Sequence, residues 1–293
     1  HKYGSGIDEI GGYPGSWKFK ASAASMRALA RAKAEKPDKF FAVWSGGGLR
    51  PELGALCRQG ADLLLLETYL WRALPDELGT EDIYGAIVSR MEPFVRATDM
   101  FQPAYGNHCY TLLAFDTSER PDRTDLGELE QVVRFVRKRF PEMRGVGWYT
   151  GGYGNEHYGM VRTEETDRHH DAVQRRADAL CFEYWVKPCV TLMQESLWLT
   201  REEDGGTVLT AAVNNIGGVD AGEVTVAFSV DGKPLRKQWT GRVPAGAGRN
   251  ESMVLVKEPI TVRPGAHSFE ARIVSAPGAT VLEPIARLDR FIE

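Results

Sequence analysis

The chain has 293 residues, of which 43% are hydrophobic and 26% are charged, a composition typical of a globular protein with a packed core. The formal net charge is -4 and the Lys and Arg residues are scattered, so we expect no nucleic-acid partner. The longest notable apolar run, 63–66, is far shorter than the roughly 20 residues of a membrane helix. The start resembles no signal peptide, and we expect that His1 is not the natural first residue.

The four cysteines do not identify a metal or redox motif. Cys57, Cys109, Cys181 and Cys189 show no CxxC spacing, which argues against a zinc ribbon or a thioredoxin-like motif. Cys181 and Cys189 lie close in sequence and form a possible disulfide in an oxidising compartment, but free buried thiols are favoured. The cysteines therefore do not settle the compartment.

The first module, 1–188, alternates short apolar strands with helices. Strands are expected at 6–10, 40–44, 62–67, 110–116 and 145–149. Helices are expected at 20–36, 51–60, 83–98, 126–140 and 167–186. This alternation predicts an α/β fold with a parallel sheet covered on both faces.

The five strand–helix units leave two architectures open. A (β/α)8 TIM barrel needs eight units and about 250 residues, so the module is either the C-terminal five-eighths of a barrel that is N-terminally incomplete or a complete five-stranded doubly wound sheet. The abrupt start favours the barrel, whereas the number of strands favours the doubly wound sheet.

The second module, 189–293, has the pattern of an all-β domain. Strands are expected at 197–200, 208–214, 224–230, 238–243, 252–256, 267–274 and 286–291. Asp231-Gly232, between the third and fourth of them, predicts a two-residue hairpin turn. Seven short strands at this spacing predict an immunoglobulin-like β-sandwich.

Three segments of this module resemble a known family. They are NNIGGVDAG at 214–222, VAFSVDG at 226–232 and PGAH at 264–267. Together they resemble the bacterial cell-adhesion-related, or CARDB-type, sandwich, and the resemblance covers 197–293. It implies an accessory module of extracellular bacterial enzymes or surface proteins, and so a secreted or cell-surface location. It implies no activity by itself.

Candidate functional residues stand where the strands of the first module end, since parallel α/β folds place their sites at the carboxyl ends of strands. Three ends carry carboxylates, in Asp8-Glu9, Glu67 and Asp116. Glycoside hydrolysis needs two carboxyl groups, one protonated and one ionised. Aromatic faces stack on sugar rings, and the following aromatics stand at or just after strand ends: Trp44, Tyr69, Trp71, Trp148 and Tyr149.

Glu67 and Glu9 are the expected catalytic pair. Glu67 follows four leucines, where an unpaired buried acid would be costly; the structural alternative is a strand-terminal acid that caps a helix or pairs with Arg72. The segment GIDEIGGYPG at 6–15 distantly resembles the acidic strand-four motif of glycosidase barrels. It has two adjacent acids in place of the spaced acids of chitinases, so a chitinase mechanism is not implied. Adjacent strand residues face opposite ways, and Glu9 is favoured over Asp8, which is assigned to substrate binding.

Two further motifs are interpreted as structural. His169-His170 lies in an expected helix, where adjacent side chains point about 100° apart, so a solvated helix face is favoured over a metal site. The glycines at 46–48 lack the Lys-Ser/Thr of a P-loop, and a loop at the mouth of the site is favoured over phosphate binding.

The sequence therefore predicts a glycoside hydrolase that acts on a poly- or oligosaccharide and needs no metal or organic cofactor. Two alternatives stay open. The first is a non-catalytic carbohydrate-binding or cell-surface adhesion protein. The second is a doubly wound domain that binds a small phosphorylated ligand at 46–48.

Overall fold

The computed structural model describes residues 5–7, 12, 14–45, 51–66, 84–85, 88–89, 112–116, 126–141, 145–149, 163–193, 195–203, 205–245 and 253–292. The chain divides into two compact units, His1–Val132 with Met143–Asp178, and Val133–Glu142 with Ala179–Glu293. The second unit thus begins before the expected module boundary between 188 and 189, which stays a prediction. Among the described residues, no helix is long and apolar enough to cross a membrane.

The first unit contains a parallel sheet whose strands follow one another in sequence order, β1-β2-β3. Its strands are β1 (Ser5–Ile7), β2 (Phe41–Ser45) and β3 (Leu63–Leu66). The connecting helices are α1 (Trp17–Glu35), which starts where the Ser16 hydroxyl accepts the Phe19 N–H, and α2 (Pro51–Gly60). Within the described residues, these strands and helices confirm the expected elements; 8–10 and 67, the expected ends of two strands, lie outside the described residues.

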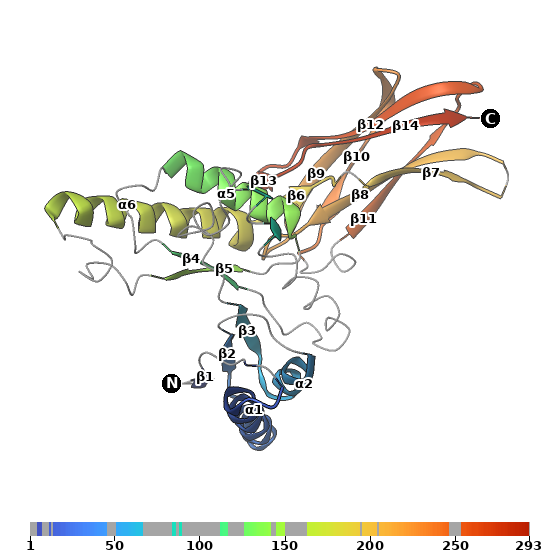
Figure 1. The fold of residues 1–293 in the computed structure, drawn as a ribbon. Helices are drawn as coiled ribbons and strands as arrows, with labels where there is room; N and C mark the ends of the chain where they lie inside the picture. Colours follow the sequence, from blue (N-terminus) through green and yellow to red (C-terminus); the bar gives the residue numbers. More distant parts are fainter. Residues whose placement is uncertain are drawn as a thin grey trace. The chain divides into compact units, whose positions relative to one another are not determined.

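Both helices pack on the same face of this sheet (Figure 1). Phe41 and Val43 of β2 share one hydrophobic cluster with residues of α1 and α2: Ala23, Met26, Leu29, Leu53 and Cys57. Helices on one face are the consequence of right-handed crossovers between strands laid down in order. A doubly wound sheet has the same arrangement within each half and reverses its strand order only at the switch point between the halves; no reversal occurs within β1–β3.

An ionic network fastens the amino-terminal edge of the sheet. The Asp62 carboxylate accepts hydrogen bonds from the Phe41 backbone N–H at 2.9 Å and from Lys33 Nζ at 2.8 Å. Lys33, from the last turn of α1, also donates to the Lys39 carbonyl at 2.8 Å. This edge is opposite the strand ends where function is expected, so we interpret the network as stabilising.

Among the described residues, the α/β part also contains two strands, two longer helices and a π-helix, besides helical residues at 84–85 and 88–89. Their bounds are β4 (Leu112–Asp116), α5 (Leu126–Arg139), β5 (Gly145–Tyr149), α6 (Glu164–Cys181) and the π-helix η4 (Phe182–Val186). β4 pairs with β5 in parallel, and β4 lies in contact with β3. The helix expected at 167–186 is thus α6 continued by a π-helical turn. Among the described residues, β1–β3 and β4–β5 form separate hydrogen-bonded groups.

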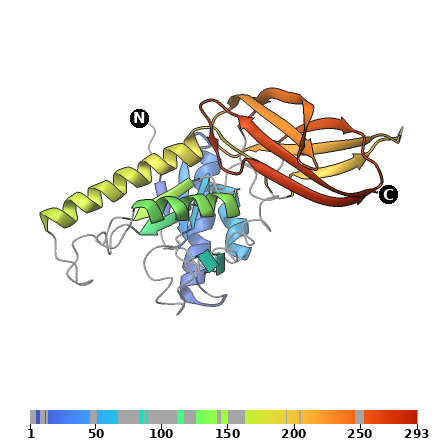
Figure 2. The same cartoon turned by 90° about the horizontal axis from the view of Figure 1, so that it is seen from above.

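The second unit contains two β-sheets with the strand orders β10-β9-β12-β14 and β11-β8-β6-β13, and β7 also pairs with β8 (Figure 2). The strands are β6 (Cys189–Thr191), β7 (Leu197–Arg201), β8 (Thr207–Asn215), β9 (Ala221–Val230), β10 (Lys233–Val243), β11 (Met253–Ile260), β12 (Gly265–Ser275), β13 (Thr280–Val281) and β14 (Ile285–Ile292). All seven expected strands are confirmed. The short strands β6 and β13, which pair in parallel, were not expected.

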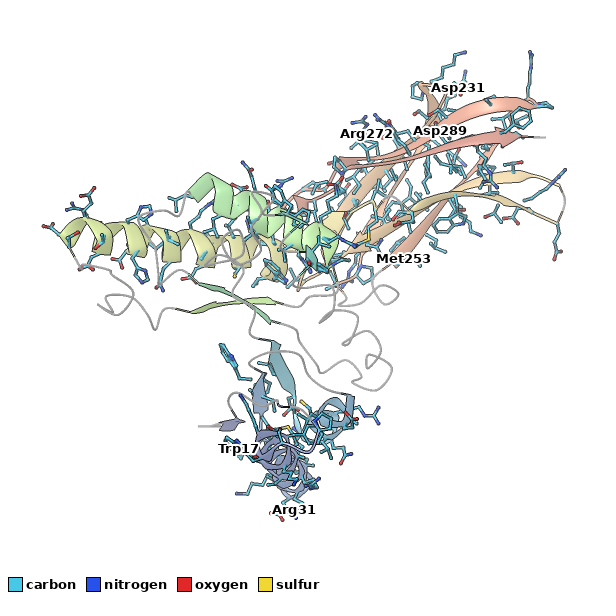
Figure 3. The ribbon with its side chains drawn as sticks, viewed as in Figure 1. Trp17, Arg31, Asp231, Met253, Arg272 and Asp289 are labelled. Carbon is cyan, nitrogen blue, oxygen red and sulfur yellow. The ribbon has the colours of Figure 1, made fainter. Side chains whose placement is uncertain are left out.

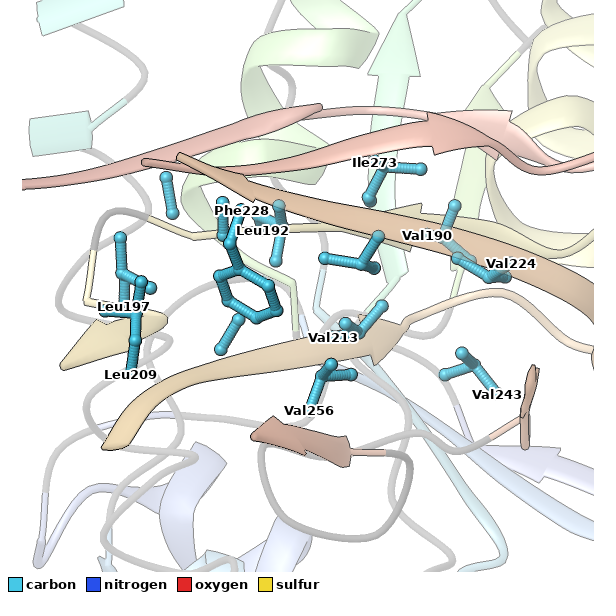
Figure 4. Packing of buried hydrophobic residues seen from close by; sticks show 14 of the residues in the cluster. Val190, Leu192, Leu197, Leu209, Val213, Val224, Phe228, Val243, Val256 and Ile273 are labelled. Atoms are coloured by element: carbon cyan, nitrogen blue, oxygen red, sulfur yellow. The ribbon is translucent and has the colours of Figure 1, made fainter. Parts of the chain in front are cut away.

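One hydrophobic core joins the two sheets (Figure 4). Leu209 and Val213 of β8 meet Phe228 of β9 and Phe269 of β12, and all four are at most 2% exposed. Buried residues alternate with half-buried or exposed ones along β9 and β12, as expected for sheets that bury one face. The unit is therefore a two-layer β-sandwich.

Asn215 explains part of the NNIGGVDAG segment in physical terms. It is fully buried, and its Oδ1 accepts the backbone N–H groups of Cys189 and Gly217, both at 3.1 Å. Its Nδ2 donates to the carbonyls of Val219 at 2.9 Å and Val243 at 3.1 Å. A Cβ on Gly217 would lie 2.0 Å from the Lys187 carbonyl oxygen. The amide thus fixes a tight crossing of β6, β8 and β10 that has no room for a side chain.

A buried arginine connects α5 to the sandwich within the second unit. Arg137 is 1% exposed, and its guanidinium donates to the carbonyls of Tyr184 at 3.0 Å, Pro141 at 2.8 Å and Ile216. Its Cζ also lies 5.1 Å from the centroid of the Trp185 ring. One side chain therefore bonds the end of α5, the π-helix and the connection that follows β8.

The described cysteines are free thiols. Cys57, Cys181 and Cys189 form no disulfide, so the possible Cys181–Cys189 pair does not occur. Burial raises the pKa of the Cys189 thiol to about 11, which keeps it protonated near neutral pH. Because the thiolate is the reactive form, Cys189 is a structural residue.

Candidate functional site

The carboxyl ends of β1, β2 and β3 lie side by side at one edge of the sheet. Ile7 pairs with Val43, and Val43 pairs in turn with Leu64, so the three strands are in level register. The chain leaves β1 into Asp8-Glu9 and leaves β3 into Glu67. Asp8, Glu9 and Glu67 themselves lie outside the described residues.

Trp44 is the predicted site residue whose side chain the structure describes. It pairs with Leu65 near the carboxyl end of β2 and is half-buried. Phe41 and Val43 face α1 and α2, so the alternation of strand side chains places Trp44 on the opposite face of the sheet. Trp44 is therefore not part of the core between sheet and helices. Tyr69 and Trp71 lie outside the described residues.

Three other predicted residues occupy the ends of β4 and β5. Asp116 and Tyr149 are facing register partners at the last position of the two strands, and Trp148 pairs with Phe115 one position earlier. The backbone thus brings a carboxylate residue and two aromatic residues to one pair of adjacent strand ends, as the sequence predicted for a parallel pair. Only their backbone positions are described.

The solvated helix face expected at His169-His170 is wrong for one of the two. His170 is 8% exposed, whereas His169 is half-buried. His170 lies on the same helix stripe as Val173 and Ala177, both fully buried, because residues three and seven apart share a face. Among the described residues, no three His, Cys, Asp or Glu side chains gather into a metal site. The glycines at 46–48 lie outside the described residues.

Two ionisable residues with specific contacts were not singled out from the sequence. One is Arg137, described above, and the other is His267, which pairs with Asp231 at 2.8 Å in the sandwich. Neither belongs to the strand ends where the site is expected. Most of their partners lie 36 or more residues away in the sequence. The exceptions are Pro141, bonded by Arg137, and Arg263, bonded by His267, each four residues away.

No protein-family model matches the sequence, and the comparison with curated proteins found no match. Similar solved structures include a CARDB domain from Pyrococcus furiosus in complex with di-metal ions, at 14% identity over 37% of this chain and 91% of that one, with a TM-score of 0.28. Eubacterium rectale Amy13B is 11% identical over 88% of this chain and 60% of its own, with a TM-score of 0.34. The GH3 beta-glucosidase of Bifidobacterium adolescentis is 13% identical over 89% and 45%, with a TM-score of 0.23.

Proposed function

We propose that the chain is a glycoside hydrolase whose α/β unit is of the TIM-barrel type and whose sandwich is an immunoglobulin-like, CARDB-type accessory domain. One observation carries the proposal. The strands β1-β2-β3 are parallel, run in sequence order and have both helices on one face, as in a (β/α) barrel. Each half of a doubly wound sheet has the same three-strand arrangement, so the doubly wound, phosphate-binding alternative is distinguished by the ligand that it expects.

Glu9 and Glu67 are the proposed acid/base and nucleophile pair. The strands that precede them, β1 and β3, are separated by one strand, which corresponds to roughly 9.6 Å between their backbones. Ile7 is level with Val43 on the helix face, whereas Leu65 is level with Trp44 on the other face. The proposal therefore needs the chain after Ile7 to turn Glu9 toward the face of Trp44. Two glutamate side chains that then lean toward each other would bring their carboxyl groups into the range used by glycosidases, about 5–5.5 Å for retention or about 6.5–9.5 Å for inversion. Unequal environments would keep one group protonated and the other ionised.

The sugar would be bound by aromatic faces and by polar side chains other than the proposed catalytic pair. Trp44 supports this part of the proposal, since its half-buried ring lies on the face away from the helices. Indole faces stack on the apolar face of a sugar ring, because burying aromatic surface is favourable. The other proposed substrate-binding residues are Asp8, Tyr69, Trp71, Asp116, Trp148 and Tyr149. No cofactor is proposed, and the location is proposed to be secreted or cell-surface.

A panel of α- and β-linked oligo- and polysaccharides tests this function. The full chain is incubated with each glycan, and the release of reducing ends is measured beside calorimetric binding to the same glycan. We expect hydrolysis of at least one glycan without added metal. Binding without any release of reducing ends would contradict the hydrolase proposal and favour the non-catalytic alternative. Binding confined to phosphorylated sugars would favour the doubly wound alternative instead.

A further inference from the structure

A histidine and an aspartate join three segments at one end of the sandwich. His267 lies near the start of β12, with its Nδ1 2.8 Å from Asp231 Oδ2 and its Nε2 2.8 Å from the carbonyl oxygen of Arg263. The other Asp231 oxygen, Oδ1, accepts the Ser268 backbone N–H at 3.0 Å. The three segments are the β9–β10 turn, the β11–β12 connection and β12 itself.

Both partners of the imidazole ring can only accept hydrogen bonds. An ionised carboxylate and a backbone carbonyl have no proton to donate, so both ring nitrogens of His267 must carry one for the two contacts to be hydrogen bonds. A neutral ring has a single N–H, and its bare nitrogen would face an oxygen at 2.8 Å. Both contacts are therefore hydrogen bonds only when the ring is the doubly protonated imidazolium.

The electrostatic surroundings agree with this protonation state. The hydrogen bond to Asp231, and to a smaller extent the one to the Arg263 carbonyl, raises the pKa of His267 above its ordinary value. The hydrogen bond from the Ser268 N–H, and to a smaller extent the one from His267, lowers the pKa of Asp231. Two cationic residues belong to the neighbouring strands: Lys233 begins β10, and Arg290 of β14 is the register partner of His267. Asp231 is in direct contact with the ring, which outweighs these more distant charges.

The turn that carries Asp231 is rigid. Asp231 and Gly232 have φ angles of 51° and 73°, the positive values that a type I′ hairpin turn requires at both central positions. β9 and β10 pair directly on either side, with Lys233 opposite Val230. The carboxylate is thus presented to β12 from a fixed position at the tip of the hairpin (Figure 3).

We propose that His267 is a pH-operated latch that holds the β11–β12 connection and the β9–β10 turn against the start of β12 while its ring carries both protons. On deprotonation Nδ1 keeps its proton and still donates it to the Asp231 carboxylate, because a carboxylate is a stronger acceptor than a carbonyl. Nε2 is the nitrogen that loses its proton. The Arg263 carbonyl then faces a lone pair, and the β11–β12 connection is released. The bond from the Ser268 N–H to Asp231 remains.

The pH window follows from the directions of the two shifts. A histidine whose pKa is raised by folding contributes stability that is complete below its unfolded pKa, about 6.5, and is lost as the pH rises through the folded pKa. An aspartate whose pKa is lowered contributes above its unfolded pKa, about 3.9, and loses this contribution as the pH falls through the folded pKa. The latch is therefore fully closed between about pH 3.9 and 6.5, and opens above the folded pKa of His267.

Ring ¹⁵N chemical shifts of His267, followed by NMR in the full chain across this range and above it, test the proposal. In the wild type, both ring nitrogens should be protonated below a titration midpoint that lies above 6.5. Asp231→Asn should lower that midpoint, since Asn tolerates positive φ but carries no charge. Asp289→Asn is the matched control, because Asp289 is an exposed carboxylate of β14 opposite Ser268.

The proposal is overturned if the wild-type midpoint is at or below 6.5, or if both variants shift the midpoint equally. A further readout separates a latch from a merely raised pKa. The backbone amide shifts of Val262 and Arg263 should titrate together with the ring, while the Ser268 amide keeps the shift of a hydrogen-bonded group. Amides of the connection that do not respond to ring deprotonation would also contradict the latch.

Discussion

Glu67→Gln is expected to reduce kcat/KM for the glycan identified in the panel by about 10²–10⁴-fold, the usual contribution of a positioned acid or base. The amide has nearly the same shape as the carboxyl group but cannot ionise, attack a sugar carbon or exchange a proton at neutral pH. Glycan binding should therefore persist while turnover is lost. Initial rates and calorimetric binding, measured on the same preparation, check both expectations.

Glu35→Gln is the control for this substitution. Glu35 is exposed at the last residue of α1, so the same chemical change there should leave the rate unaltered. Glu9→Gln should act like Glu67→Gln, since both groups are needed for one reaction. A Glu67→Gln variant that keeps wild-type turnover would remove Glu67 from the mechanism.

Arg137→Ala is expected to lower the free energy of unfolding of the second unit by about 3–5 kcal/mol. The guanidinium donates to the carbonyls of Tyr184, Pro141 and Ile216 and is 1% exposed. Each buried acceptor left without a donor costs about 1–3 kcal/mol, and the three costs are not fully additive. A loss of this size is a large fraction of the roughly 5–15 kcal/mol that stabilises a whole domain. Arg137→Lys should recover part of it, because an ammonium group cannot span three carbonyls like the planar guanidinium fork.

Lys138→Ala is the matched control for the arginine. Lys138 is the next residue of α5, and its side chain is 58% exposed and pairs with Glu283 at 2.8 Å. A surface ion pair of this kind contributes about 0–1 kcal/mol. Denaturant unfolding of the full chain, followed by circular dichroism, should separate the two variants clearly. Equal midpoints for Arg137→Ala and Lys138→Ala would show that the three carbonyl contacts do not stabilise the unit.

Local patterns account for the parts of the fold that could be predicted. The apolar run at 63–66, the hairpin turn at Asp231-Gly232 and the alternation along 224–230 are each determined by neighbouring residues, and all three elements occur as expected. Parallel pairing of β1, β2 and β3 also followed from the alternation of strands with helices. The short strands β6 and β13 were missed because two or three residues carry no periodic pattern.

The charged contacts could not be predicted, because long-range contacts determine them. Arg137, Lys138 and Arg139 form a basic last turn of α5; the spacing of Arg137 from Val133 and Phe140 puts it on the apolar face but does not identify its partners. Its partners Tyr184 and Ile216 lie 47 and 79 residues away. His170 is a different case, because its spacing from Val173 and Ala177 was visible in the sequence and indicates a buried stripe.

The structure describes the strands that lead to the candidate site but not all of the predicted site residues. The strand ends that precede Asp8-Glu9 and Glu67 lie at one edge of the sheet, as the parallel arrangement predicted. The carboxylates themselves stay predictions, as do the roles of Tyr69 and Trp71. Where a side chain points after a strand ends depends on loop geometry, which residue spacing alone does not determine.

The distance between the carboxyl carbons of Glu9 and Glu67, measured in a crystal structure of the full chain, tests the central claim most directly. We expect a shared cleft at the carboxyl edge of β1–β3 and a distance of about 5–9.5 Å between the two carboxyl carbons, the range that spans retaining and inverting glycosidases. Carboxyl groups that point to opposite faces of the sheet, or that lie well beyond this range, would contradict a two-carboxylate mechanism for this chain.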